Sequence, residues 1–311
     1  MEYYFIYNPV SGTAKVRQEF LENIDKSGLE YKLIETSESG DAQKIVRDIC
    51  MNRSDSQQSI RIFACGGDGT VSQVINGAYG FNNVEIGAIP LGTGNDFIRN
   101  FGDVSSYMDI KKYARSSSRE CDLIKYRAIT DGQVRDGFCV NMFNIGLDCN
   151  IVEMTGSVKK FPLISGSLAY LISVFVILIK REGANLKVIY DNGDVYNGRL
   201  MLISIANGCY CGGGIKGLPR AVTDDGFFDV SLIKYVTRRE FLQLFPLYSK
   251  GVHLENSKVI AKDIIDYRHE KSLKIEAMDS FFKLCVDGEI FRCQSAEFAI
   301  DERAFRFIVP D

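Results

Sequence analysis

The sequence predicts an α/β domain followed by a mainly antiparallel β domain. In the first third of the chain, short apolar runs alternate with segments whose apolar residues recur at helical spacing, which is typical of parallel strands joined by helices. After about Ala128 this rhythm gives way to strand-like runs separated by turn residues. The chain has 311 residues, 46% of them hydrophobic, and is long enough for two domains with a sizeable core.

The first predicted domain starts with a strand near the N-terminus. The expected strands are Tyr3–Tyr7, Tyr31–Glu35, Arg61–Ala64 and Ile86–Ile89. The expected helices are Ala14–Asp25, Asp41–Met51, Val71–Tyr79 and a short helix from Asn95. In the first helix, Val16, Phe20 and Ile24 share one face. Elements that alternate in this way form parallel strands with right-handed crossovers, so we expect an open, mostly parallel sheet.

The second predicted domain contains strands with few helical segments between them. The expected strands are Phe138–Asn144, Leu186–Tyr190, Arg199–Ala206, Phe228–Lys234, Ser272–Ala277 and Phe281–Val286. Turn sequences such as Asp191–Asp194 favour antiparallel pairing, as in a β-sandwich-like domain. We place the first domain at residues 1–127, completed by residues 299–311, and the second at residues 128–298.

The composition excludes several classes of function. Lys and Arg number 37 against 40 Asp and Glu, without long runs of one sign, so nucleic acid is not expected as the main partner. The nine cysteines are scattered, and neither of the two histidines lies near a cysteine pair, which favours reduced thiols over a zinc site. The N-terminus lacks the pattern of a signal peptide, so we expect a cytoplasmic protein.

One uncharged segment, Phe161–Ile179, has a length just inside the range of a membrane-spanning helix. Pro162, Gly166 and several serines dilute its hydrophobicity, and no second hydrophobic segment accompanies it. We therefore favour a helix that is buried in the second domain or lies at an interface. Basic residues flank the segment at Lys159, Lys160, Lys180 and Arg181.

Three glycine-rich turns are expected at the carboxyl ends of the parallel strands, where open α/β sheets bind ligands. These turns are Asn8–Gly12, Gly66–Thr70 and Leu91–Phe97. They offer backbone N–H groups, the hydroxyls of Ser11, Thr70 and Thr93, and helix N-termini that favour anions. One such turn alone is explained by a tight strand-to-helix connection, but three in phase indicate a polyphosphate. Neither the P-loop motif nor the dinucleotide motif is present.

Together, Asn8-Pro9-x-Ser11-Gly12, Gly66-Gly67-Asp68-Gly69-Thr70 and Leu91-Gly92-Thr93-Gly94-Asn95-Asp96-Phe97 resemble the diacylglycerol kinase catalytic domain. The likeness is strongest to soluble bacterial lipid kinases related to diacylglycerol and sphingosine kinases. It continues in Gly212–Gly214, Pro219–Val230 and Val286–Glu289 and so spans the whole chain. The Gly-Gly-Asp-Gly-Thr motif alone is shared with NAD kinases and phosphofructokinase-like enzymes, and the resemblance implies a first domain of that fold.

The resemblance also implies the residues of a nucleotide site. These residues are Asn8, Pro9, Ser11, Gly12, Thr36, Gly66, Gly67, Asp68, Gly69, Thr70, Val71, Ser72 and Thr93. Asp68 would act in catalysis by facing the Mg²⁺ that accompanies ATP, because a lone carboxylate beside phosphate oxygens would repel them. Lys15 lies near the first turn. It could contact the nucleotide or could equally be a solvated lysine on the following helix.

Glu289 is implied to be the general base that accepts the proton of the attacking lipid hydroxyl. The alternative is that Asp287-Gly288-Glu289 is only a hairpin turn, since Asp-Gly between strand-like runs is a hairpin signal. A structural Mg²⁺ is implied at Asp225, with the main-chain carbonyls of Val222 and Phe227 as further ligands.

Two more acids have a role only through the resemblance. Asp96 and Asp122 would connect the structural Mg²⁺ to Asp68 through water, although Asp122 is otherwise only an acid at the start of a strand. Cys209 and Cys211 precede the triple glycine, and the sequence assigns them no role.

The sequence therefore predicts an ATP- and Mg²⁺-dependent lipid kinase. Diacylglycerol leads as the acceptor, with phosphatidic acid as the product; sphingoid bases, ceramide, monoacylglycerol and phosphatidylglycerol stay open. The alternatives are an NAD kinase-type phosphotransferase and an inactive, nucleotide-binding lipid carrier or regulator. The expected partner is a lipid at the membrane surface, reached by peripheral contact through the cations that flank Phe161–Ile179, and a homodimer stays open.

Overall fold

The structure is a computed structural model that describes residues 1–53, 59–146 and 183–310. The apolar segment Phe161–Ile179 and its flanking cations lie outside the described residues. Within the described part of the chain, no helix combines the length and the hydropathy that crossing a bilayer requires.

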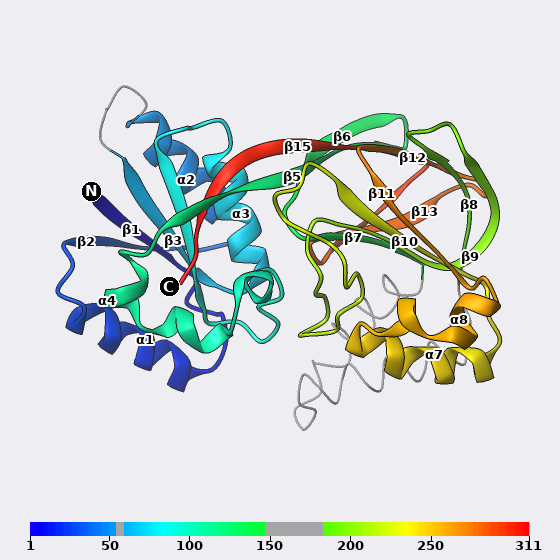
Figure 1. Ribbon diagram of the computed structural model, residues 1–311. Coiled ribbons are helices and arrows are strands. Elements are labelled where there is room, and N and C mark those ends of the chain that lie inside the picture. Colours follow the sequence, from blue (N-terminus) through cyan, green and yellow to red (C-terminus); the bar gives the residue numbers. More distant parts are fainter. Residues whose placement is uncertain (54–58, 147–182, 311) are drawn as a thin grey trace.

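The first domain is an open parallel sheet with helices on both faces (Figure 1). Its strands are β1 (Glu2–Tyr7), β2 (Tyr31–Glu35), β3 (Ile60–Gly66) and β4 (Val84–Pro90), in the order β2-β1-β3-β4. Its helices are α1 (Ala14–Lys26), α2 (Asp41–Met51), α3 (Asp68–Ala78) and the short α4 (Ile110–Tyr113). The predicted parallel sheet is therefore confirmed, because each strand pairs in parallel with its neighbours.

Burial explains why β3 lies inside the sheet. Every residue of the central strand β3 is buried, as expected for a strand covered by helices on both faces. Phe63 of β3 stacks on Phe5 of β1 with ring centroids 4.8 Å apart. From α1, Phe20 and Ile24 complete this core, as their helical spacing predicted.

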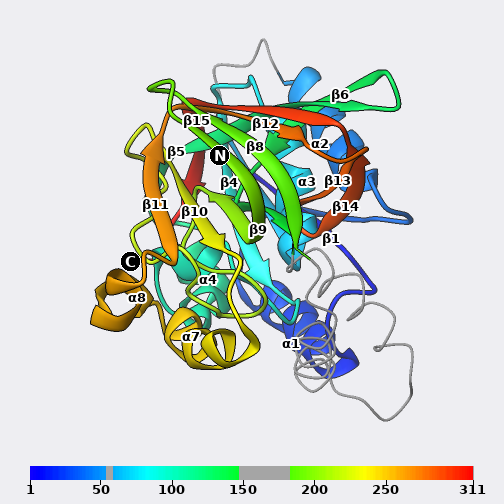
Figure 2. The same cartoon turned by 90° about the vertical axis from the view of Figure 1, so that its right-hand side faces the viewer.

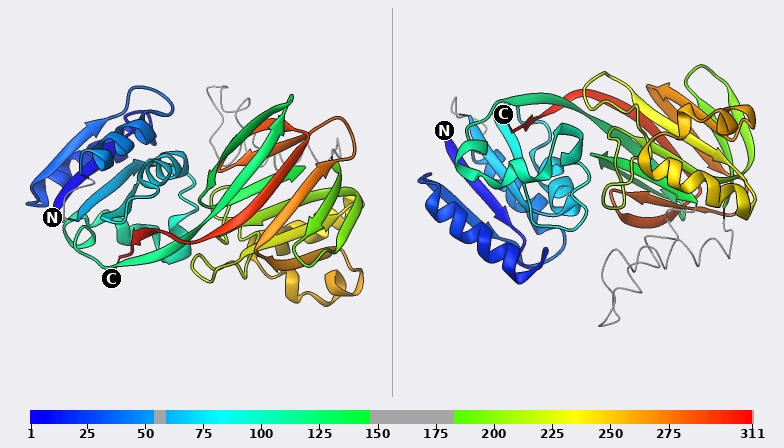
Figure 3. Two further views of the ribbon diagram at one scale, coloured as in Figure 1. Left: turned by 90° about the horizontal axis from the view of Figure 1, so that it is seen from above. Right: turned by 60° about the horizontal axis from the view of Figure 1, so that its bottom comes forward.

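The second domain is an antiparallel β-sandwich (Figures 2 and 3). Its first strands are β5 (Ser118–Thr130), β6 (Gln133–Cys139), β7 (Met142–Gly146), β8 (Ala184–Tyr190), β9 (Val195–Ala206) and β10 (Phe228–Lys234). The later strands are β11 (Ile265–Glu270), β12 (Ser272–Ala277), β13 (Phe282–Val286), β14 (Glu289–Cys293) and β15 (Ser295–Ile308). Two helices, α7 (Arg238–Lys250) and α8 (Ser257–Ala261), pack at one end of this domain.

The long strands β5 and β15 run side by side from one domain to the other (Figure 1). In the second domain β15 pairs with β12, and at its far end Arg306 and Phe307 pair in parallel with β4. The predicted domain boundaries, after residues 127 and 298, both fall inside these continuous strands. The C-terminal residues thus extend the sheet of the first domain.

Two predicted elements differ from the structure. The expected strand Phe138–Asn144 is broken between β6 and β7, because the N–H groups of Val140 and Asn141 bind the carboxylate of Asp287 and not a neighbouring strand. The expected helix from Asn95 is replaced by short 3₁₀ turns at Ile98–Phe101 and Val104–Met108, since Asn95 has a left-handed φ of 51° that no helix continues.

Candidate active site

The three glycine-rich turns meet at the carboxyl end of the parallel sheet. The N–H of Asn8 donates to the carbonyl of Cys65 at 3.0 Å, which ties the first turn to the end of β3. The N–H groups of Leu91 and Gly92 both donate to the carbonyl of Gly66, at 3.0 and 3.2 Å. The structure thus brings together the three turns that the sequence placed at strand ends.

Glycine is needed where these turns touch. Gly12 has a φ of 66°, and a Cβ at this position would lie 1.9 Å from the carbonyl oxygen of Leu91. A Cβ on Gly92 would lie 2.5 Å from the Cα of Gly67. Any side chain at Gly12 or Gly92 would therefore push the turns apart and separate their N–H groups.

The second turn leads into α3, whose N-terminus is capped by Gly67 without a side-chain hydrogen bond. The first N–H groups of the helix and its partial positive charge therefore stay available to an anion. Asn8 donates from Nδ2 to Thr70 Oγ1 at 3.3 Å, which joins the first turn to this helix. The side chain of Val71, by contrast, is buried in the core, so only its backbone lies near the turn.

The other predicted nucleotide residues border the same turns. Thr36 follows β2, is buried, and donates from its N–H to the carbonyl of Tyr7 at 2.9 Å. Pro9 and Ser11 are half-buried in the first turn, and Thr93 is exposed in the third. Ser72, one turn into α3, donates from Oγ to Asp287 at 3.0 Å.

Asp68 is the first residue of α3, and its Oδ1 accepts the N–H of Phe97 at 3.1 Å. Its other oxygen faces Gly94, at which a Cβ would lie 2.9 Å from Asp68 Oδ2 and 3.3 Å from Asp96 Oδ2. Burial, together with the charges of Asp96 and Asp287, raises the pKa of Asp68 to about 6, although main-chain N–H groups oppose the shift. Three carboxylates from different segments therefore converge beside the glycine-rich turns.

Asp96 joins the third turn to the second domain. Its Oδ2 accepts the N–H of Gly213 at 2.9 Å, and its Oδ1 accepts the N–H of Gly214 at 2.7 Å. The guanidinium of Arg99 lies 3.9 Å away. Burial raises the pKa of Asp96, while the two N–H groups oppose the shift by stabilising the charged form. The triple glycine thus serves as the donor partner of Asp96.

Glu289 begins β14, directly after the tight turn at Asp287 and Gly288. The hairpin offered as an alternative is present, because β13 and β14 pair antiparallel around this turn. The Glu289 side chain is 68% exposed, and its carboxylate lies 3.6 Å from the guanidinium of Arg135. The turn itself contacts α3 through Asp287 and Ser72, so the base candidate lies on a hairpin that touches the first domain.

The loop predicted to hold a structural Mg²⁺ is closed by its own backbone. Asp225 Oδ1 accepts the N–H of Phe227 at 3.1 Å, and the side chains of Val222, Asp225 and Phe227 are all exposed. Among the described residues, no group of three or more His, Cys, Asp and Glu side chains is arranged to hold a metal ion. Any ion in this loop would depend mainly on main-chain carbonyls and water.

Asp122 is fully buried within β5, five residues into the strand and not at its start. Its Oδ2 accepts the N–H of Gly226 at 2.8 Å, and its Oδ1 accepts the N–H of Arg303 at 2.7 Å. Burial raises its pKa, and the two N–H groups oppose that shift. Asp122 thus ties the Asp225 loop and β15 to β5.

The donor set around Asp68 suits Mg²⁺ held largely by phosphate oxygens. Mg²⁺ prefers hard oxygen ligands, and in phosphoryl-transfer sites it uses one or two carboxylates together with substrate phosphates and water. Asp68 offers one carboxylate oxygen toward Gly94, and a cation there would offset the repulsion that raises its pKa.

Sequence reasoning missed the part that Asp287 plays. Its carboxylate binds Ser72 and the segment between β6 and β7, at sequence separations of 145 to 215 residues. The only signal was the Asp-Gly pair, which was interpreted as turn chemistry.

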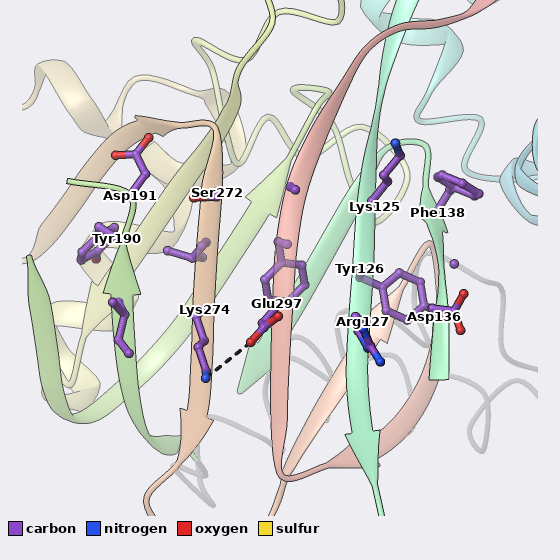
Figure 4. Close-up of a pocket in the computed structure, with 15 residues that line it drawn as sticks. Lys125, Tyr126, Arg127, Asp136, Phe138, Tyr190, Asp191, Ser272, Lys274 and Glu297 are labelled. Atoms are coloured by element: carbon purple, nitrogen blue, oxygen red, sulfur yellow. Dashed lines mark ion pairs between the residues drawn. The ribbon is translucent and has the colours of Figure 1, made fainter. Parts of the chain in front are cut away.

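A separate pocket of about 600 Å³ lies on the sheet formed by β6, β5, β15, β12 and β8 (Figure 4). Figure 4 shows Lys274 and Glu297 at its centre, paired at 3.4 Å. None of the predicted nucleotide, catalytic or metal residues lines this pocket. It is therefore a different feature from the turn cluster around Asp68.

Comparison with known proteins gives matches along almost the whole chain. The model of the diacylglycerol kinase catalytic domain matches residues 2–126, and the model of the YegS C-terminal NAD kinase beta sandwich-like domain matches residues 142–308. A diacylglycerol kinase of Bacillus subtilis (strain 168) is 27% identical over 310 residues, which cover 98% of this chain and 95% of the relative. A diacylglycerol kinase of Staphylococcus aureus (strain MRSA252) is 28% identical over 313 residues, which cover 98% and 91%.

Solved structures show the same fold. A putative diacylglycerol kinase from Bacillus anthracis str. Sterne superposes with a TM-score of 0.72 at 24% identity, covering 99% of this chain and 96% of the other. Yeast NADH kinase complexed with NADH superposes with a TM-score of 0.54 at 11% identity, covering 100% and 84%. The NAD kinase-like fold of the first domain is thereby confirmed. With both domain models matched in order, the chain belongs to the diacylglycerol kinase catalytic-domain family.

Proposed function

We propose that this protein is a lipid kinase that uses ATP and Mg²⁺ and transfers the γ-phosphoryl group to a lipid hydroxyl. Diacylglycerol is the leading acceptor, with phosphatidic acid as the product. The observation that carries the proposal is the meeting of three glycine-rich turns at the N-terminus of α3, beside Asp68. Relatives named diacylglycerol kinase, which match 98% of this chain, support a lipid as the acceptor.

In the proposed reaction the turns bind the phosphates of ATP. The N–H groups of Gly67, Asp68 and Gly69 at the start of α3 would face the phosphate oxygens, and the hydroxyls of Ser11 and Thr93 border the same turns. Phosphoryl transfer depends mainly on positioning and on stabilising charge, which this arrangement of backbone donors supplies.

Asp68 would hold the Mg²⁺ that accompanies ATP, through the oxygen that faces Gly94. When bound, the ion would neutralise charge on the phosphate oxygens. We further propose the Asp225 loop, with the carbonyls of Val222 and Phe227, as a second and structural Mg²⁺ site, supported by its resemblance to the family pattern and by its exposed carboxylate.

Glu289 is the proposed general base. Its exposed carboxylate would accept the hydroxyl proton of the lipid as the lipid oxygen bonds to the γ-phosphorus and the bond to the bridging oxygen of ADP breaks. The hairpin that carries Glu289 contacts α3 at Ser72, and this contact supports a position beside the nucleotide.

We also propose a cytoplasmic protein that contacts membranes peripherally. Eight cysteines among the described residues are free thiols, as in a reducing compartment. The proposed contact uses Lys159, Lys160, Lys180 and Arg181, which lie outside the described residues. Binding should favour anionic vesicles and weaken with salt. A homodimer is tested independently by sedimentation of the purified chain.

A panel of acceptors tests the proposed reaction. Purified protein is incubated with ATP, Mg²⁺ and, separately, diacylglycerol, a sphingoid base, ceramide, monoacylglycerol, phosphatidylglycerol or NAD, and products are identified by mass spectrometry. We expect phosphatidic acid to dominate, and Glu289→Gln to reduce it by about 10²-fold or more. Phosphorylated NAD as the main product would favour the NAD kinase alternative, for which the fold of yeast NADH kinase is the supporting observation. No phosphorylated product from any acceptor would favour an inactive carrier.

A further inference from the structure

Two Asp-Gly turns in this chain share one backbone conformation but differ in what their aspartates bind. Asp287 and Gly288 join β13 to β14 with φ angles of 45° and 97°. Asp131 and Gly132 join β5 to β6 with φ angles of 49° and 78°. Asp and Asn both tolerate this left-handed conformation, so hairpin geometry alone explains an Asp-Gly or Asn-Gly pair at either turn.

The carboxylate of Asp287 accepts hydrogen bonds from two other segments of the chain. Its Oδ2 accepts the N–H of Val140 at 2.9 Å, and its Oδ1 accepts the N–H groups of Asn141 and Met142 at 3.0 and 3.2 Å. The thiol of Cys139 donates to Oδ1 at 3.1 Å, and Ser72 Oγ donates to Oδ2 at 3.0 Å.

Asp131 has no comparable set of partners. Its side chain is exposed, and its carboxylate accepts none of the hydrogen bonds found in the described part of the chain. Turn geometry therefore accounts for Asp131, whereas it leaves the five donors of Asp287 unexplained.

The donors of Asp287 connect three parts of the proposed site. Ser72 lies one turn into α3, four residues after Asp68, and Asn76 donates from Nδ2 to the Ser72 carbonyl at 2.8 Å. Cys139 ends β6, Met142 begins β7, and Val140 and Asn141 form the break between them. Glu289 follows Asp287 by two residues. One carboxylate thus links the phosphate-binding helix to the hairpin that carries the base candidate.

We propose that Asp287 is a positioning residue that sets the hairpin of Glu289 against the nucleotide turn. The inference rests on the proposed function, because it assigns Glu289 and the turn to one reaction. Hydrogen bonds from backbone N–H groups to an ionised carboxylate are about twice as strong as neutral ones, so they hold the segment of Cys139–Met142 firmly. The Ser72 bond then transmits this rigidity to α3.

The kinetic test uses Asp287→Asn with Asp131→Asn as its matched control. Asn keeps the turn conformation at both sites, but at Asp287 its NH₂ group would face N–H donors. We expect Asp287→Asn to lower kcat by about 10²-fold through misplacement of the base, with KM for ATP changed less than about 3-fold. Asp131→Asn should stay within about 2-fold of the wild type in both constants.

Ser72→Ala provides a milder second variant if Asp287→Asn fails to fold. It should lower kcat by about 10-fold, and its effect should not add to that of Asp287→Asn, because both variants break one connection. The positioning role would be overturned if Asp287→Asn kept the wild-type kcat or if Asp131→Asn lost as much activity. It would also be overturned if the losses in Asp287→Asn and Ser72→Ala were additive, or if Asp287→Asn changed only KM.

Hydrogen exchange tests the connection without catalysis. In Asp287→Asn the amides of residues 139–142 and of residues 72–76 in α3 should exchange faster than in the wild type, while Asp131→Asn leaves them unchanged. Unchanged exchange would overturn the inference even in an active enzyme. If the wild type phosphorylates no acceptor, the proposed function fails, and the exchange result still decides whether Asp287 joins the two domains.

Discussion

Asp68 is half-buried and Asp122 is fully buried, and the two carboxylates differ in the groups that contact their oxygens. Asp122 sits inside β5, and each of its oxygens accepts a main-chain N–H, from Gly226 at 2.8 Å and from Arg303 at 2.7 Å. Asp68 begins a helix beside glycine-rich turns and leaves one oxygen facing Asp96 across Gly94. The arrangement at Asp122 joins distant segments of the fold, whereas the oxygen of Asp68 that faces Gly94 is the one that we propose for Mg²⁺.

Burial raises the pKa of both groups, but the second-largest cause differs in sign. At Asp68 it is the charge of Asp96, which raises the pKa; main-chain N–H groups oppose the shift, and the pKa is about 6. At Asp122 the N–H groups of Arg303 and Gly226 are the next largest causes, and they lower the pKa. Repulsion between ionised carboxylates lowers the stability of the folded protein at neutral pH. Such destabilising groups are commonly found at functional sites.

The largest expected effect is at Asp68. Asp68→Asn keeps the size of the side chain and removes the charge that would hold Mg²⁺, so kcat should fall by about 10³-fold or more in a lipid kinase assay. The loss should appear at saturating Mg²⁺ as well as at low Mg²⁺. Turnover near that of the wild type would contradict the distinction between the two aspartates.

The same variant should be at least as stable as the wild type near pH 7. Because the folded protein holds the Asp68 proton with a pKa of about 6 against a usual 3.8, the wild type loses stability as pH rises through this window. Asp68→Asn removes this loss, worth about 1 kcal/mol after allowance for solvent screening. Thermal melts at pH 4.5 and 7.5 would measure it.

Asp122→Asn should act mainly on stability. The NH₂ group of Asn would meet a main-chain N–H inside the protein, at a cost of about 3 kcal/mol. Denaturant unfolding should record this loss, while kcat at 25 °C stays within about 3-fold of the wild type. A large loss of kcat with unchanged unfolding would instead place Asp122 in the water-linked network that the family resemblance implies.

His253 extends the comparison to a buried base in the second domain. It is fully buried, and this burial lowers its pKa from 6.5 to about 4. As pH falls, the unfolded chain therefore binds a proton at this histidine before the folded protein does. The stability contributed by neutral His253 is thus complete above pH 6.5 and is lost as pH falls toward 4. The loss is about 2–3 kcal/mol. His253→Leu should flatten the acid side of the stability profile; an unchanged slope there would assign the acid sensitivity to other groups.

The smallest expected effect concerns the Asp225 loop. If the loop holds a structural Mg²⁺, adding Mg²⁺ should stabilise the wild type by about 1 kcal/mol, or about 2–4 °C in Tm. Asp225→Ala should abolish this shift, and Asp224→Ala, at the neighbouring exposed acid, should keep it. Equal melting of the wild type with Mg²⁺ and with a chelator would remove the proposed ion.

The first domain could be predicted from sequence because its signals are local. The apolar residues of β1, β3 and β4 and the helical spacing of α1 and α2 are readable within a few residues, and their alternation predicts parallel strands with right-handed crossovers. In the second domain, α7 was missed although Thr237 and Glu240 form a capping box, a signal that lay in the sequence.

The site could be predicted only in part. The glycine-rich turns and Asp68 stand out because strand ends and glycine patterns are local features. The role of Asp287 could not be read in this way, since Ser72 lies 215 residues away and the Val140 and Asn141 N–H groups carry no sequence signal. Where a carboxylate is satisfied by backbone donors, only the fold identifies its partners.

The most direct test of the account compares three proteins in one transfer assay. Wild type, Asp68→Asn and Asp122→Asn are incubated with ATP labelled at the γ-phosphate, Mg²⁺ and vesicles of diacylglycerol with anionic phospholipid, and the labelled lipid is separated and identified. We predict labelled phosphatidic acid from the wild type and from Asp122→Asn, and essentially none from a folded Asp68→Asn. Equal labelling by Asp68→Asn, or a wild type that labels no lipid, would contradict the account.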